Sequence, residues 1–357
     1  MYVFFRRMLF VCVALLAGAT QSLVAGPDSV PPSLPDGFFN EHTVLFARVD
    51  LNAVNIGHMQ QGIRAILPIV SATQEKDEPG IVNMMRVLRV LSENPQLLEQ
   101  IKKRNPGHPV ILAESVAVSL LAADFSEIFV LGQMEKQELE SLDLYLLLPR
   151  GDQQQLPEAA VKAFGSFGMS VKTAGRWFVA SREENLPSSG DGFGLEEVVF
   201  FDAIRSNPDH DVMVSIVPPQ ESRKAAKDVA EKAINDSSGA FMVAPFLEVL
   251  MAEWYYASLH LGEQPVLRVS AHLADEATPK SLVANYKSIL NKTVASEADT
   301  KEQEIVFGFL KKVLPEADGK FLTLNLDQPK LALAMQTMVD EAYAKEEARK
   351  KKEAGSN

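Results

Sequence analysis

The stretch AEWYYASLHLGEQPVLRVSAHLA, residues 252–274, decides how the second half of this chain folds. Side chains alternate in character on both sides of Gly262-Glu263-Gln264, and this period of two predicts a pair of β-strands joined by a turn. A register that places Leu259 opposite Leu267 gathers apolar side chains on one face. We therefore expect a β-hairpin with that face committed to a core.

The other face of this hairpin is the candidate ligand-binding surface. In the same register Trp254 faces His272, whereas His260 lies six residues further along its strand, about 20 Å away. This separation excludes a metal ion shared by the two histidines. A mixed aromatic and polar face suits a peptide, a glycan or another domain. The candidate ligand-binding residues are Trp254, Tyr256, Ser258, His260, Arg268, Ser270 and His272.

Two alternatives stay open for this stretch. In the first, helices or a second module cover part of the polar face, because Tyr and Trp are ordinary strand residues. In the second, Trp254 ends the preceding helix, since Leu250 and Met251 also fit helical spacing with it.

Each half of the chain predicts the same order of elements: strand, helices, two strands, helix, strand. This is the order of a βαββαβ unit with inserted helices. We therefore predict an α+β fold of two tandem modules, each with a mainly antiparallel sheet and helices on one face. The alternative is one larger mixed domain. The predicted strands are 42–50, 126–132, 142–149, both arms of 169–181, 211–219, both arms of 252–274, and 320–326.

The N-terminus has the layout of a secretory signal peptide. Arg6 and Arg7 form a basic region, and an apolar run from Met8 to Leu16 precedes small residues. An uncleaved anchor is the alternative, although the run is short for a membrane span. We expect no later span. The predicted segments are a signal peptide at 1–25, a linker at 26–41, a module at 42–182, a linker at 183–194, a module at 195–345 and a frayed charged tail at 346–357.

Charge and cysteine content exclude several classes of protein. The formal net charge is -12 at pH 7, and an acidic chain without a basic stripe is a poor nucleic-acid binder. The one cysteine, Cys12, lies inside the predicted signal peptide. The mature chain would then contain no disulfide and no cysteine nucleophile. An exported protein without disulfides is more typical of a bacterial envelope than of a eukaryotic secretory route, where disulfides are common.

Motifs for catalysis and cofactors are weak. Gly165-Ser166-Phe167-Gly168 has the wrong spacing for a nucleophile elbow and is typical of a helix end. The six histidines include no His-x-x-x-His pair, and residues 207–211 lack the ligand spacing of a calcium loop. Acidic pairs such as Glu196-Glu197 are typical of a solvated surface rather than of a glycosidase. We therefore predict no catalytic residue, no metal and no cofactor.

Three segments carry a resemblance: LFARVDLNAV (45–54), VMVSIVPP (212–219) and GMSVKTAGRWFVAS (168–181). Together with the predicted signal peptide, they resemble secreted proteins of unknown function from planctomycete-type bacteria. The resemblance covers most of the chain. It implies no known reaction and therefore assigns no catalytic residue.

The sequence thus favours an exported, non-enzymatic protein that binds or scaffolds an envelope protein, a peptide or a glycan. The alternative is an extracytoplasmic hydrolase whose site is assembled from residues distant in the sequence. A pocket with a cluster of Ser, His or carboxylate groups would favour the enzyme, whereas a shallow groove would favour binding.

Overall fold

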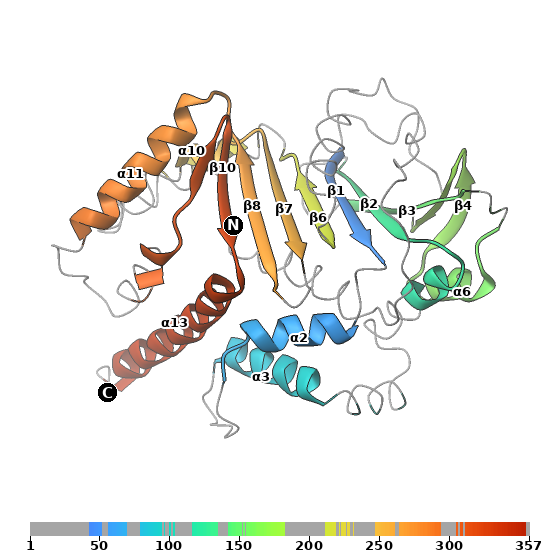
Figure 1. The fold of residues 1–357 in the computed structure, drawn as a ribbon, viewed down its shortest axis with the longest axis horizontal. Coiled ribbons are helices and arrows are strands. Elements are labelled where there is room, and N and C mark those ends of the chain that lie inside the picture. Colours follow the sequence, from blue (N-terminus) through green and yellow to red (C-terminus); the bar gives the residue numbers. More distant parts are fainter. Residues whose placement is uncertain are drawn as a thin grey trace. The chain divides into compact units, whose positions relative to one another are not determined.

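The computed structural model combines antiparallel β-sheet with α-helices (Figure 1), which confirms the predicted α+β class. The predicted signal peptide at 1–25 and the predicted linkers at 26–41 and 183–194 lie outside the described residues. The structure describes residues 43–51, 56–69, 79–94, 116–134, 142–151, 155–182, 211–218, 247–260, 264–293 and 311–354, with isolated residues between these ranges.

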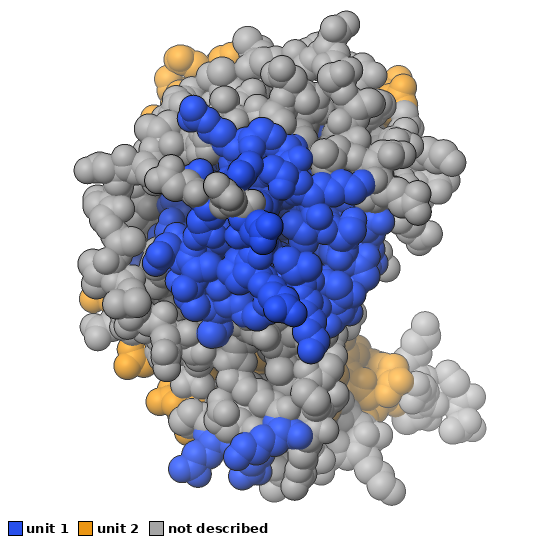
Figure 2. Space-filling view, turned by 90° about the vertical axis from the view of Figure 1, so that its right-hand side faces the viewer, with its two compact units in different colours: residues 1–59, 96–219, 256–262 blue, residues 60–95, 220–255, 263–357 orange. Residues whose placement is uncertain are grey.

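The chain divides into two compact units, which Figure 2 shows in different colours. The predicted modules are contiguous in sequence, whereas these units are not. Strand pairing is the physical reason, because β6 (Val212–Ile216) pairs antiparallel with β1 (Thr43–Asp50) and so joins the first half of the chain. Unit 1 comprises residues 1–59, 96–219 and 256–262, and unit 2 comprises residues 60–95, 220–255 and 263–357.

Unit 1 is built on an antiparallel sheet in which the N-terminal strand β1 pairs with β2 and β6. Its neighbours follow the order β4-β5-β3-β2-β1-β6, and β7 (Trp254–His260) lies beyond β6. The tight turn between β4 and β5 contains Gly175, whose φ of 56° suits glycine. The remaining strands are β2 (Glu127–Met134), β3 (Leu142–Pro149), β4 (Ser170–Ala174) and β5 (Trp177–Ser181).

Both faces of this sheet are buried. On one face, Leu120 and Phe164 pack against the strands from the helical segment 116–121 and from α6 (Glu158–Ser166). On the other face, Phe129 stacks on Phe46 with ring centroids 5.7 Å apart and meets the edge of Trp177 at 5.5 Å. Trp177 is only 1% exposed. These aromatic rings therefore form the second core layer of unit 1.

Unit 2 contains the strands β8, β10 and β9, in that order, and most of the longer helices. Apolar side chains of α11 and α10 pack on one face of β8 and β10, and α13 packs on α3. The bounds are β8 (Val266–His272), β9 (Glu316–Asp318), β10 (Phe321–Leu326), α2 (Ile56–Ile66), α3 (Gly80–Glu93), α10 (Leu247–Leu250), α11 (Ala277–Thr293) and α13 (Gln328–Ala354).

The two halves of the chain follow the same path of neighbouring strands. The first half runs β1-β2-β3-β5-β4, and the second half runs β6-β7-β8-β10-β9. The last helix differs from the prediction, because α13 continues through the expected frayed tail as far as Ala354. Ion pairs one turn apart, Glu341–Lys345 and Glu346–Arg349, support that extension.

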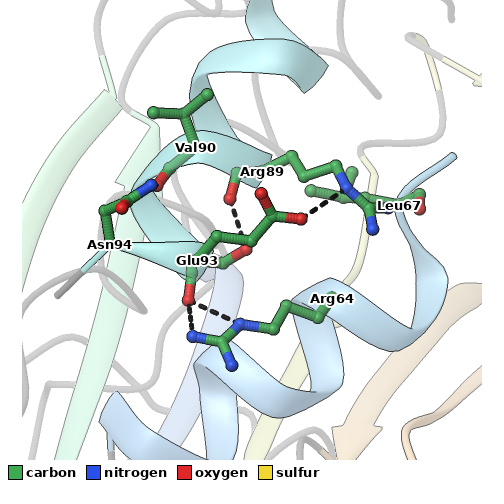
Figure 3. Close-up of polar contacts among 7 residues, drawn as sticks. Arg64, Leu67, Arg89, Val90, Glu93 and Asn94 are labelled. Carbon is green, nitrogen blue, oxygen red and sulfur yellow. Dashed lines mark hydrogen bonds and ion pairs between the residues drawn. The ribbon is translucent and has the colours of Figure 1, made fainter. Parts of the chain in front are cut away.

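Two arginines join the C-terminal ends of α2 and α3 in unit 2 (Figure 3). Arg64 of α2 donates to the carbonyl of Ser92 from Nε at 2.6 Å and also from Nη2. In return, Arg89 of α3 donates to the carbonyl of Leu67 at 2.8 Å and pairs with Glu93. Each helix end exposes carbonyls without a partner in its own helix and carries partial negative charge. The two guanidinium groups therefore offset the partial negative charges of the two helix ends, which would otherwise repel each other.

We expect Arg64→Ala to destabilise the protein by about 1.5–3 kcal/mol, because a partly buried carbonyl loses a charged hydrogen-bond donor. Urea unfolding would measure the loss. Glu93, the exposed ion-pair partner of Arg89, provides the control. Glu93→Ala should lower the free energy of unfolding by less than about 1 kcal/mol. Equal losses in both variants would contradict this account of the helix ends.

Candidate functional site

Three rings from three strands meet at one end of the sheet in unit 2. Trp254 begins β7, His272 ends β8 and Phe321 begins β10, where it faces His272 across the strand pair. The Trp254 ring stacks on His272 with centroids 5.3 Å apart and an interplanar angle of 20°. The edge of Phe321 meets Trp254 at 5.4 Å and His272 at 5.1 Å. We call these three residues the aromatic cluster, and its Trp254–His272 contact is the one that the sequence predicts.

The aromatic cluster is partly open to solvent and has a carboxylate beside it. All three rings are partly buried, and the Glu253 side chain is 51% exposed. Oε2 of Glu253 lies 2.9 Å from Nδ1 of His272, at ion-pair distance but without hydrogen-bond geometry. The backbone N–H of Glu253 donates to the carbonyl of His272 at 2.9 Å, which holds the two residues side by side. The site therefore offers ring surface and negative charge together.

The backbone beneath the aromatic cluster is anchored in a core. Tyr255 points to the opposite face, where its hydroxyl donates to the carbonyl of Val249 at 2.6 Å. Burial raises the pKa of Tyr255 to about 12, partly offset by the nearby charge of Arg223. Tyr255 packs there on Ala271 and Leu282. Because side chains alternate along a strand, this packing fixes the position of the neighbouring Trp254.

Other predicted site residues are covered. Tyr256, Ser258 and Ser270 are 4%, 1% and 3% exposed, so a ligand from solvent does not reach them. Ser270 forms a buried hydroxyl pair with Thr323 of β10, with the two oxygens 2.9 Å apart. Arg268 is partly buried and faces Asn325. Part of the predicted polar face is therefore covered, whereas the side chains at its Trp254–His272 end stay partly exposed.

His260 lies in unit 1 and has a different partner. Its Nδ1 is 3.2 Å from Oδ1 of Asp211, whose side chain is 6% exposed, whereas the His260 side chain is 41% exposed. A carboxylate on Nδ1 orients an imidazole with Nε2 outward, which is how general-base histidines are held. Further charged residues lie at this end of the sheet, where Asp50 faces Glu127 and Arg48 pairs with Glu127 at 2.9 Å.

Three residues of these arrangements were not predicted: Glu253, Phe321 and Asp211. All three residues lie within predicted strands, but their partners depend on which strands pair. No local pattern indicates that β10 lies next to β8 or that β6 lies next to β7. The signal available in the sequence was the alternation that puts Trp254 and His272 on one face.

The described part of the chain holds no group of three or more His, Cys, Asp or Glu side chains able to bind a metal ion. Within the same ranges, the helices are too short or too polar to cross a membrane.

Comparisons with known proteins do not assign this chain to a family. No protein-family model matches the chain, and no curated protein matches it. A solved structure, crystal form I of the Treponema protein TP0453, aligns with 88% of this chain and 99% of its own at 9% identity. The TM-score is 0.33, so this likeness carries no argument about function.

Proposed function

We propose that this chain is an exported, non-enzymatic protein of the bacterial envelope that binds a peptide or a glycan at the aromatic cluster. The observation that carries the proposal is the partly exposed Trp254 ring, held by three strands beside the carboxylate of Glu253. Rigid rings supply contact area at low entropic cost, and a neighbouring carboxylate adds specificity. The basic and apolar segments of residues 1–25 support export.

Isothermal titration calorimetry tests the binding. The probes are a tetramer of N-acetylglucosamine, hexa-lysine and hexa-serine. We expect saturable heat with the glycan or with one peptide, and none with that probe when Trp254→Ala is titrated. The proposal fails if no probe saturates, or if the alanine variant binds as tightly as the parent chain.

A reporter fusion tests export separately. Residues 1–25 joined to bacterial alkaline phosphatase should give an active enzyme, because that enzyme forms its disulfides only outside the cytoplasm. A fusion in which Met8–Leu16 is interrupted by two arginines is the control and should be inactive. Inactive phosphatase in both fusions would contradict export through this segment.

The Asp211–His260 pair favours a second candidate function, a hydrolase. In this reaction Nε2 of His260 takes a proton from water, the oxygen attacks an ester carbonyl, and the proton passes to the leaving alkoxide. Hydrolysis of p-nitrophenyl acetate tests it: His260→Gln and Asp211→Asn should each lower kcat about 100-fold or more. His272→Gln is the matched control and should keep the parent rate. Equal rates in all variants exclude this function.

A further inference from the structure

We propose that the ligand of the aromatic cluster is cationic, namely a Lys- or Arg-rich peptide segment of an envelope protein. The inference rests on the proposed function and specifies its ligand. The evidence for a cationic ligand is the set of charged side chains near the rings in unit 2. The alternation of side chains in 252–274 does not reveal these charges.

Carboxylates lie on two sides of the aromatic cluster. Glu253 precedes Trp254 and approaches His272. On the other side, Asp318 of β9 faces Phe321, and Glu316 faces Thr323 two positions further along the same strand pair. Both β9 carboxylates are exposed. We call Glu253, Glu316 and Asp318 the acidic rim, and its members come from segments about 60 residues apart in sequence.

The basic residue nearest to the rings in sequence has its own acidic partner. Lys320 precedes Phe321, and its charge helps to lower the pKa of Asp275, which the N–H and hydroxyl groups of Thr278 lower most. The carbonyl of Lys320 accepts a hydrogen bond from Leu273 at 2.9 Å, which places Lys320 beside the end of β8. Lys320 therefore supplies one positive charge, fewer than the negative charges that Asp275 and the acidic rim supply together.

Ring faces and carboxylates together recognise organic cations. An ammonium or guanidinium group is attracted to the face of Trp and Phe rings, and a nearby carboxylate adds a direct ion pair. The formal net charge of -12 also speeds the approach of a cationic partner. A neutral sugar would gain from stacking but nothing from the acidic rim. Charge complementarity therefore selects a basic peptide over a glycan.

A fluorescence titration tests this ligand class. The Trp177→Phe variant leaves Trp254 as the single tryptophan, so emission reports on the aromatic cluster. We expect saturable binding of hexa-lysine and hexa-arginine that weakens about tenfold between 0.05 and 0.5 M NaCl, because salt screens exposed charges. Hexa-serine and the N-acetylglucosamine tetramer should leave the emission unchanged.

Charge-neutralising variants locate the interaction. Glu253→Gln and Asp318→Asn should each weaken hexa-lysine binding by about two- to fivefold. Glu158→Gln, an exposed carboxylate on α6 of unit 1, is the matched control and should bind like the parent. Equal weakening in all three variants would show attraction to net charge alone and overturn the inference.

The outcomes separate this inference from the proposed function. Saturable binding of the N-acetylglucosamine tetramer alone, lost in Trp254→Ala, would overturn the cationic ligand and leave the binding function standing. Saturation by none of these probes would overturn both.

Discussion

Replacing Trp254 with alanine should abolish saturable ligand binding and leave the fold intact. Trp254 is the largest residue of the aromatic cluster and is partly exposed, and its ring centroid lies 5.3 Å from that of His272 and 5.4 Å from that of Phe321. Losing a central aromatic anchor commonly weakens binding by 2 kcal/mol or more, or about thirtyfold. Each lost ring pair should cost only about 1 kcal/mol of stability. Calorimetric titration with hexa-lysine measures the first effect, and urea unfolding measures the second.

The same variant distinguishes a binding role from a structural one. Trp254→Phe is the control, because a smaller ring keeps part of the stacking on His272 and should keep part of the affinity. A loss of cooperative unfolding in Trp254→Ala would contradict the account, since it would show that the aromatic cluster is part of the structural core rather than a surface that binds a ligand.

Trp177→Ala should give the largest loss of stability, about 3–5 kcal/mol. Trp177 is 1% exposed and meets the ring of Phe129, which in turn stacks on Phe46. Removal of the indole would therefore leave a cavity in the second core layer of unit 1. Urea unfolding followed by circular dichroism measures the change in the free energy of unfolding.

The substitution Trp177→Ala has a matched control variant. Trp177→Phe refills most of the volume and should lose clearly less stability than Trp177→Ala. An alanine variant that loses less than about 1 kcal/mol would contradict the burial on which this core layer rests.

Most strands of this protein can be predicted from the sequence because apolar and polar side chains alternate along them. The predicted strand at 142–149 has the bounds of β3, and both arms of the stretch 252–274 are strands, so Trp254 does not end a helix. The edge strand β9 was missed because its three residues, Glu316–Asp318, offer no apolar alternation. The helix that precedes the stretch 252–274 is described only as α10, Leu247–Leu250.

Only half of the candidate site could be predicted. The contact between Trp254 and His272 follows from one hairpin, because the two arms are adjacent in sequence. Phe321 joins them through pairing of β10 with β8, and about 50 residues separate these strands. Burial of Tyr256 and Ser258 depends on what packs over the sheet, which alternation along one strand does not reveal. Local periodicity therefore identified the rings of the hairpin, whereas tertiary packing added Phe321 and decided which hairpin side chains are exposed.

Acrylamide quenching of Trp254 emission tests the central claim most directly. In the Trp177→Phe variant the quencher should reach the partly exposed Trp254 ring in the free protein. Saturating hexa-lysine should lower the quenching constant at least about twofold, because a bound ligand on the aromatic cluster shields the ring. An unchanged quenching constant, at a peptide concentration that saturates binding in calorimetry, would contradict the claim that this end of unit 2 holds the ligand.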